Sequence, residues 1–297
     1  MRFSTKSGCR KVGVRREVVE VVSNKDGPMF SVIIPVRNMR EHVAKAIESV
    51  LEQSYKNYEL IVVDGDSTDG TKGVLEMFSD QLDVYISEPD TGQSNAINKG
   101  FRHAKGDYLS WLNADEEYLP DTLEKVAQVI VEASDIDFIY GDRLVVDLTN
   151  GTREINRYPR MHPKRYHLYW GRVLPTDASF WSRSAHKKTG VVNEEEFAHL
   201  AMDYEWFLRL SFNVRRWKKI EEPLSIFKQH PDRKTPNAEK SQVDRLWYSA
   251  RRGVITRHRL SSANLFWGWC SAGLQARIQK RQFMLPRLAT AAKILKK

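Results

Sequence analysis

The chain has 297 residues, of which 41% are hydrophobic and 29% are charged, and its net charge at pH 7 is +9. This composition is typical of a soluble globular protein and excludes a disordered chain. No run of 18 uncharged apolar residues occurs, so no membrane-spanning helix is predicted, and two cysteines without CxxC spacing favour a reducing cytoplasm over a disulfide framework or zinc site.

The positive charge is concentrated at the two ends of the chain. Residues 1–30 hold seven Lys or Arg against three acids, and residues 251–297 hold eleven against none. Residues 31–250 hold 29 basic and 35 acidic residues, a net charge of −6. This distribution favours ends that touch an anionic surface over a body that binds nucleic acid.

From Phe30 onward, strand-like and helix-like segments alternate. Short buried runs rich in β-branched residues predict strands, and apolar residues at helical spacing predict helices. The predicted elements are strand 30–36, a helix around 43–51, strand 58–64, a helix from Thr71, strand 84–87, helix 94–104, strand 107–112 and helix 120–133. Such alternation predicts right-handed βαβ units in a mostly parallel sheet, with ligands bound at the carboxyl ends of the strands.

The second half of the chain has a different pattern. Asn150-Gly151 lies between two alternating segments, which is a strong β-hairpin signal. The predicted elements are a hairpin of 143–148 and 153–158, a short strand at 180–182, a helix at 201–212 and a basic helical region from about Lys240.

Polar clusters follow the predicted strands. Asn113 and Asp115 end the fourth strand and lie on one side of it, because strand side chains alternate. Two such oxygen-bearing groups suit Mg²⁺ or Mn²⁺, but they also suit a turn or a helix cap. After the second strand, Asp64 and Asp66 suit either hydrogen bonds from a base or ribose or a solvated turn.

A third polar segment is the Pro-Asp-Thr-Gly turn at residues 89–92. It leads into a helix whose N-terminus can face an anion, with Lys99 further along, although a plain tight turn explains the same residues. The aromatic candidates for stacking on a sugar are Trp111, Tyr166, Tyr169, Trp170, Phe180 and Trp181. Trp111 is expected in the core, and Tyr169, Trp170 and Trp181 are the preferred sugar platforms.

The order of these motifs resembles family 2 glycosyltransferases with the GT-A fold. The resemblance is carried by SVIIPVRN, VVDGDSTDGT and SEPDTGQSNAINKGFRHAKGDYLSWLNADE, and it continues into ASFWSRSAHKKTGVVNEEEFAHLAMDYEWFLRL. It covers roughly residues 30–235. Within the family, the chain most resembles bacterial enzymes that build exopolysaccharide, capsule or lipopolysaccharide. The fold class it implies is α/β, with a Rossmann-like nucleotide-binding half, an acceptor half and a basic helical C-terminal extension.

The resemblance also implies roles for individual residues. The residues that it places around the nucleotide are Pro35, Arg37, Asp64, Asp66 and Asp90. Asn113-Ala114-Asp115 takes the place of the Asp-x-Asp metal motif, with Asp115 as the ligand of Mg²⁺ or Mn²⁺ and of the diphosphate. Asp203 takes the place of the general base, with a helix N-cap as the alternative. His230 resembles a late histidine that approaches the metal or diphosphate, with a merely solvated side chain as the alternative.

Two residues depart from the family pattern. Asn113 stands where the first metal-motif acid is usual, which implies weaker metal binding and predicts that Asn113→Asp is tolerated. Gly65 separates Asp64 from Asp66, where the paired acids are usually adjacent. The predicted organisation is a basic N-terminal extension (1–29), a GT-A domain (30–238) with a nucleotide-sugar half (about 30–118) and an acceptor half (about 119–238), and a basic helical extension (239–297).

The predicted function is that of an inverting, metal-dependent hexosyltransferase of cell-surface polysaccharide synthesis. Its expected partners are a nucleotide-diphosphate sugar, a saccharide or lipid-linked saccharide acceptor, and an anionic membrane surface that binds residues 251–297. This predicts a cytoplasmic protein held on the inner face of the cytoplasmic membrane, with a helical extension that packs Trp267, Trp269 and Phe283 onto the body as the alternative. One alternative is a catalytically inactive nucleotide-sugar-binding protein of the same fold, which Asn113 suggests. A second is a nucleic-acid-binding protein, but the sequence contains no nucleic-acid recognition motif.

Overall fold

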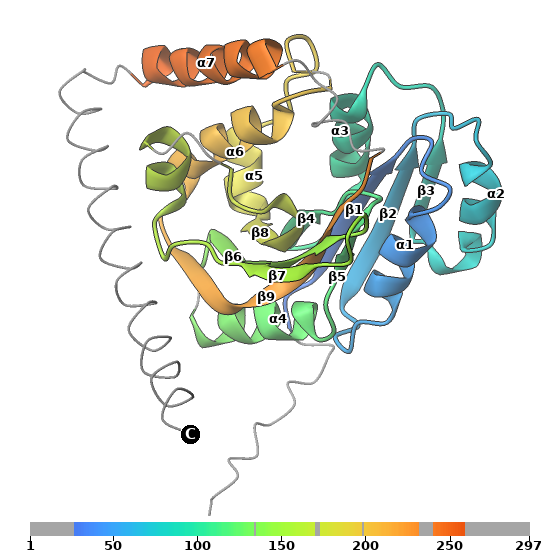
Figure 1. The fold of residues 1–297 in the computed structure, drawn as a ribbon. Helices are drawn as coiled ribbons and strands as arrows, with labels where there is room; N and C mark the ends of the chain where they lie inside the picture. Colours follow the sequence, from blue (N-terminus) through green and yellow to red (C-terminus); the bar gives the residue numbers. More distant parts are fainter. Residues whose placement is uncertain (1–26, 134, 170–172, 198, 232–239, 259–297) are drawn as a thin grey trace, which may run out of the picture.

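A nine-stranded sheet runs through the described part of the chain (Figure 1). The computed structural model describes residues 27–133, 135–169, 173–197, 199–231 and 240–258. The strands are β1 (Phe30–Val36), β2 (Tyr58–Asp64), β3 (Val84–Ser87), β4 (Tyr108–Trp111), β5 (Glu116–Tyr118), β6 (Phe138–Asp147), β7 (Arg153–Asn156), β8 (Ser179–Ser182) and β9 (Trp217–Gln229). Their order is β3-β2-β1-β4-β8-β6-β9-β5, and β7 pairs with β6 outside this path.

Helices cover both faces of the sheet. The α-helices are α1 (Val43–Leu51), α2 (Thr71–Glu76), α3 (Gln93–His103), α4 (Thr122–Glu132), α5 (Arg183–Thr189), α6 (Met202–Asn213) and α7 (Lys240–Arg257). Shorter turns of helix are η1 (Ser79–Gln81), η2 (Arg165–Tyr169) and η3 (Thr176–Ala178). The predicted α/β layering is therefore confirmed, and the predicted helix and strand bounds in the first half differ from the observed ones by only one or two residues.

The alternation of side chains along β1 separates two hydrophobic cores. Val32 and Ile34 point to the face covered by α1, α2 and α4, whereas Ile33 points to the face covered by α3, α5 and α6. All three side chains are fully buried. Burying an isoleucine contributes about 1.5–3 kcal/mol, so a strand that is apolar on both sides is stable only between two helical layers.

The strands β3, β2, β1 and β4 pair in parallel. Strand β8 lies between β4 and β6 and is antiparallel to both. The predicted hairpin is confirmed as β6 and β7. The long strand β9 was not predicted, because Glu221, Glu222 and Pro223 interrupt its pattern. Pro223 lies opposite Asp142 where the β6–β9 register shifts, and a strand tolerates proline at such an irregularity.

An aromatic cluster fills the core between the sheet and α6. Trp181 lies 4.9 Å from Trp206 and 5.6 Å from Phe207, measured between ring centroids. Trp181 and Phe180 are completely buried, so the prediction that Trp181 is a sugar platform is wrong. Trp111 is buried as predicted. Tyr166, a candidate for stacking on a sugar, is also buried, and the side chains of Tyr169 and Trp170 lie outside the described residues.

The predicted C-terminal helix is present as α7, which places Ala250 and Val254 against the α6 side of the core. Residues 1–26 and 259–297 lie outside the described part of the chain. The membrane anchor predicted for residues 251–297 and the location that follows from it therefore stay predictions. In the described ranges, none of the helices combines the length and the apolar character that crossing a bilayer requires.

Gly106 lies so close to β1 that the fold requires a residue without a Cβ atom there. A Cβ at Gly106 would lie 2.5 Å from the nitrogen of Ser31 and 2.6 Å from the carbonyl carbon of Phe30. Backbone atoms of a central strand cannot move aside, so we expect Gly106→Ala to lower the free energy of unfolding by about 1–3 kcal/mol in denaturant titrations. The control is Gly73→Ala on α2, where no atom lies within 4 Å. It should raise stability by up to about 1 kcal/mol, and equal losses in the two variants would contradict the packing argument.

Candidate active site

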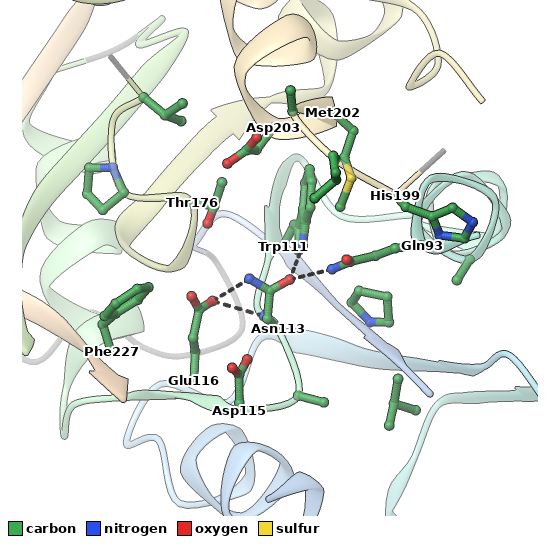
Figure 2. A pocket seen from close by; sticks show the side chains of 18 of the residues that line it. Gln93, Trp111, Asn113, Asp115, Glu116, Thr176, His199, Met202, Asp203 and Phe227 are labelled. Atoms are coloured by element: carbon green, nitrogen blue, oxygen red, sulfur yellow. Dashed lines mark hydrogen bonds between the residues drawn. The ribbon is translucent and has the colours of Figure 1, made fainter. Parts of the chain in front are cut away.

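A cavity of about 400 Å³ opens at the carboxyl ends of β1 and β4 (Figure 2). The parallel strands form one wall, and loops around Thr176 and Ala201 and the β9 residue Phe227 form the other. Six of the residues predicted to form the site line this cavity: Pro35, Arg37, Asp90, Asn113, Asp115 and Asp203.

At one end of the cavity, Asp90 forms an anionic anchor that is almost buried. Its Oδ1 accepts a hydrogen bond from the Gly92 N–H (2.9 Å) and lies 3.6 Å from Nη1 of Arg37, whose side chain is half exposed. A Cβ at Gly65 would overlap the Oδ2 of Asp90. The glycine between Asp64 and Asp66 is therefore needed to let the Asp90 carboxylate approach the β2 loop.

The structure places four predicted site residues outside the cavity lining: Asp64, Asp66, Lys99 and His230. Asp64 is fully buried and accepts hydrogen bonds from the hydroxyls of Ser67 and Ser87 (2.5 and 2.7 Å). Asp66 pairs with Lys72, whose hydrogen bond and charge lower the pKa of Asp66. These two carboxylates shape the β2 loop, and their contact with a nucleotide stays a prediction.

Lys99 is the third of these residues. It lies on α3, where its Nζ contacts Oε1 of Glu88 (2.7 Å) and donates a hydrogen bond to the carbonyl of Pro89 (2.9 Å). Its charge therefore stabilises the loop that carries Asp90, and direct contact with the donor stays a prediction.

Asn113 uses both ends of its amide in hydrogen bonds with the protein. Its Oδ1 accepts from Trp111 Nε1 and from Gln93 Nε2, each at 2.9 Å, and its Nδ2 donates to Glu116 Oε2, also at 2.9 Å (Figure 2). Burial raises the pKa of Glu116 well above its ordinary value, and the negative charges of Asp177 and Asp115 raise it further. Sequence patterns did not assign a role to Gln93 or Glu116.

Asp115 and His230 lie side by side although 115 residues separate them in the chain. The Nε2 of His230 is 3.1 Å from Oδ2 of Asp115, and the His230 ring lies 4.3 Å from the ring of His42, measured between centroids, at an interplanar angle of 32°. The carboxylate suits Mn²⁺ or Mg²⁺, which prefer oxygen ligands and keep waters and substrate phosphates in their coordination. In the described ranges no three acidic, histidine or cysteine side chains gather as a cation site, and a metal role for Asp115 and His230 stays a prediction.

Asp203 lies on the opposite wall of the cavity from Asp115 (Figure 2). The N-cap of α6 is Ala201, with a left-handed φ of 58°, so Asp203 is not the cap of this helix. Its Oδ1 accepts a hydrogen bond from the Tyr204 N–H at 2.7 Å. Burial raises the pKa of Asp203, and the backbone hydrogen bonds and the charge of Arg143 partly oppose this shift. A carboxylate of raised pKa is a stronger proton acceptor once it is ionised.

A cationic and aromatic group that sequence patterns did not reveal completes the floor of the cavity. The Arg143 guanidinium lies 3.7 Å from the ring centroid of Phe227 and 3.3 Å from Oδ1 of Asp177. Tyr158 and Phe227 also line the cavity, and they are better placed to contact a sugar than the buried Trp181. Arg143 and Phe227 meet only because β6 and β9 pair, and no local motif marks either of them.

Comparisons with known proteins agree on one family. The model of Glycosyl transferase family 2 matches residues 31–190, which is more than half of the chain. TuaG of Bacillus subtilis (strain 168), named for teichuronic acid biosynthesis, is 36% identical over 110 residues, which are 36% of this chain and 44% of TuaG. A PGL/p-HBAD biosynthesis glycosyltransferase of Mycobacterium bovis (strain BCG / Pasteur 1173P2) is 37% identical over 119 residues, 39% of this chain and 46% of the relative. The chain thus matches less than half the length of these relatives.

Two solved structures share the fold. Residues 1–349 of S. aureus TarS, in complex with UDP-GlcNAc, superpose with a TM-score of 0.64 and 19% identity over 83% of this chain and 72% of that one. The mannosyltransferase PcManGT from Pyrobaculum calidifontis, in complex with GDP-Man and Mn²⁺, gives a TM-score of 0.58 and 14% identity over 92% of this chain and 82% of that one. These similarities confirm the predicted GT-A fold.

Proposed function

Because the chain belongs to glycosyl transferase family 2, we propose that it transfers a hexose from a nucleotide-diphosphate sugar to a hydroxyl of a saccharide or lipid-linked saccharide, in the synthesis of a cell-surface polysaccharide. One observation carries this proposal. Asp115 and Asp203 line opposite walls of the same cavity, whose volume of about 400 Å³ falls in the range of small-molecule sites.

In this proposal Asp203 is the general base. The acceptor hydroxyl oxygen forms a bond to the anomeric carbon while the bond from that carbon to the diphosphate oxygen breaks. Asp203 takes the hydroxyl proton, and the electron pair of the broken bond leaves with the diphosphate. Such a single displacement inverts the anomeric centre. The opposite positions of Asp203 and Asp115 support it, because the acceptor and the leaving group must lie on opposite sides of the sugar carbon.

Charged and polar side chains form the end of the cavity where the nucleotide-diphosphate sugar would bind. Arg37, Asp90 and Pro35 line one end of the cavity, and Asp115 and His230 would hold Mg²⁺ or Mn²⁺. When bound, the cation supplies positive charge that stabilises the leaving diphosphate. A protein that binds the donor without transferring it is the alternative, and measuring binding and transfer separately distinguishes the two.

A donor screen tests the proposal. Thermal unfolding should be followed with UDP-, GDP- and dTDP-sugars, each with and without Mn²⁺. We expect one nucleotide class to stabilise the protein by about 2.7 kcal/mol at a hundred times its dissociation constant, and more weakly without Mn²⁺.

Two controls make the screen specific. Asp90→Ala removes the buried anchor and should abolish the stabilisation, whereas Asp80→Ala, an exposed site on η1, should keep it. Stabilisation without transfer to any saccharide acceptor would favour the inactive binding protein, and the absence of stabilisation by every donor would contradict the proposal.

A further inference from the structure

The orientation of the Asn113 amide is determined by its neighbours. Trp111 Nε1 can only donate a hydrogen bond, so the Asn113 atom that lies 2.9 Å from it must be the oxygen Oδ1. Gln93 Nε2 donates to the same oxygen at 2.9 Å. Both lone pairs of Oδ1 are therefore used by the protein. The other end of the amide, Nδ2, necessarily points away from Trp111.

Glu116 receives that other end of the amide. Its Oε2 accepts hydrogen bonds from Nδ2 of Asn113 at 2.9 Å and from the backbone N–H of Asn113 at 3.1 Å. Since Oε2 accepts two N–H groups, it is not an oxygen that carries a proton. Glu116 is only 2% exposed, and a buried carboxylate oxygen without such partners is costly.

The two residues also close a turn around Asp115. The backbone N–H of Glu116 donates to the carbonyl of Asn113 at 3.0 Å, in the direction opposite to the two bonds that Oε2 accepts. Residues 113–116 thus form a turn closed from both ends. Asp115 is the third residue of this turn, so the direction of its carboxylate toward the cavity and His230 depends on the closure.

We propose that Glu116 is a positioning residue of the active site, and that it makes an amide, not a carboxylate, the required group at position 113. Asn113 then holds the turn that aims Asp115 and does not itself supply an oxygen to the cation. The transfer rates that test this inference rest on the proposed function. The melting temperatures do not, because the hydrogen bonds also contribute to the stability of the folded protein.

The inference reverses the expectation from sequence that Asn113→Asp is tolerated. An aspartate at position 113 would keep one oxygen on Trp111 and Gln93 and place the other about 2.9 Å from Glu116 Oε2, where the amide nitrogen lies now. The carboxylate has no N–H to donate, so the side-chain hydrogen bond that closes the turn is lost, and the two oxygens repel each other wherever Glu116 is ionised. If Asn113 were instead a lost metal ligand, the same substitution would restore a better site and raise activity.

The test is a double-mutant cycle of Asn113→Asp, Glu116→Gln and the variant carrying both. Thermal unfolding is measured without metal or donor, and transfer rates are measured with both. Asn113→Asp should lower the melting temperature and reduce transfer by roughly tenfold or more. Glu116→Gln should have a small effect, because its side-chain oxygen can accept the same two bonds. The double variant should regain part of both losses, since the amide introduced by Glu116→Gln can donate to the new carboxylate, although its nitrogen no longer accepts the backbone N–H of residue 113.

The matched control is Asn193→Asp. The Oδ1 of Asn193 accepts the backbone N–H groups of Glu195 and Glu196, which a carboxylate accepts equally well, so this variant should behave like the wild type. If Asn113→Asp does not fold alone, recovery of folding in the double variant supports the proposal. Wild-type behaviour of Asn113→Asp, or a double variant no better than it, overturns the proposal. If no protein in the set transfers a sugar, the proposed function fails while the melting temperatures still test the turn.

Discussion

Replacing Asp203 with asparagine should lower kcat at least about 100-fold and leave the dissociation constant of the donor nearly unchanged. Asparagine has almost the same shape, so it can keep the hydrogen bond from the Tyr204 N–H, but it cannot accept the proton of the acceptor hydroxyl. Steady-state kinetics with saturating acceptor, together with donor titration, measure the two quantities. Asp80→Asn on the exposed turn η1 is the matched control and should retain full activity.

The pH dependence gives this prediction a second readout. Burial raises the pKa of Asp203, so its ionised fraction falls at a higher pH than that of an ordinary aspartate. The rate of the wild type should therefore decline as the pH is lowered through this raised pKa, and this limb should be missing in Asp203→Asn. Loss of donor binding in the variant would indicate a structural role for Asp203. A product with retained anomeric configuration would exclude single displacement.

Asp115→Asn should abolish transfer and remove the response of donor binding to Mn²⁺, with the fold intact. An amide keeps the size of the side chain but loses the negative charge that a hard cation requires. The side chain is mostly buried but lines the cavity, and Asp115 is the carboxylate paired with His230. The melting temperature without ligands should stay close to that of the wild type, and titration with Mn²⁺ in the presence of donor should show no stabilisation.

Two controls accompany this variant. A chelator should inhibit the wild type to the same extent as the substitution does, and Asp80→Asn should keep its full response to Mn²⁺. Full activity of Asp115→Asn, or undiminished wild-type activity with the chelator present, would refute the metal assignment.

Features that depend on local pattern were predictable from the sequence. The apolar runs of β1 and β2 identify buried parallel strands, and polar residues that follow Val36 and Leu112 do line the same cavity. Asp115 and Asp203 were identified through the order of family motifs. That order carries information about distant contacts that periodicity lacks.

The direction of a side chain was not predictable where two environments suit the same residue type. Asp64 follows a strand as a nucleotide-binding acid would, and the structure adds hydrogen bonds from Ser67 and Ser87 that its position in the sequence did not indicate. A tryptophan such as Trp181 can either stack on a sugar or fill a hydrophobic core. Its packing against Trp206 shows that it belongs to the core. The role proposed for Glu116 could not be predicted, because it depends on the hydrogen bonds between its carboxylate and Asn113, three positions earlier.

The pairing of β5 with β9 has a consequence for how such enzymes can be recombined. Glu116 lies opposite Phe227 in this pairing. The register of β5 and β9 therefore fixes the position of the turn that carries Asp115 relative to the end of β9, which His230 follows. A deletion or insertion of one residue in β9 would reverse every side chain beyond it and shift His230 by about 3.3 Å. Chimeras that exchange acceptor specificity between relatives should therefore join at exposed loops such as residues 148–152, and they should leave the β5–β9 alignment untouched.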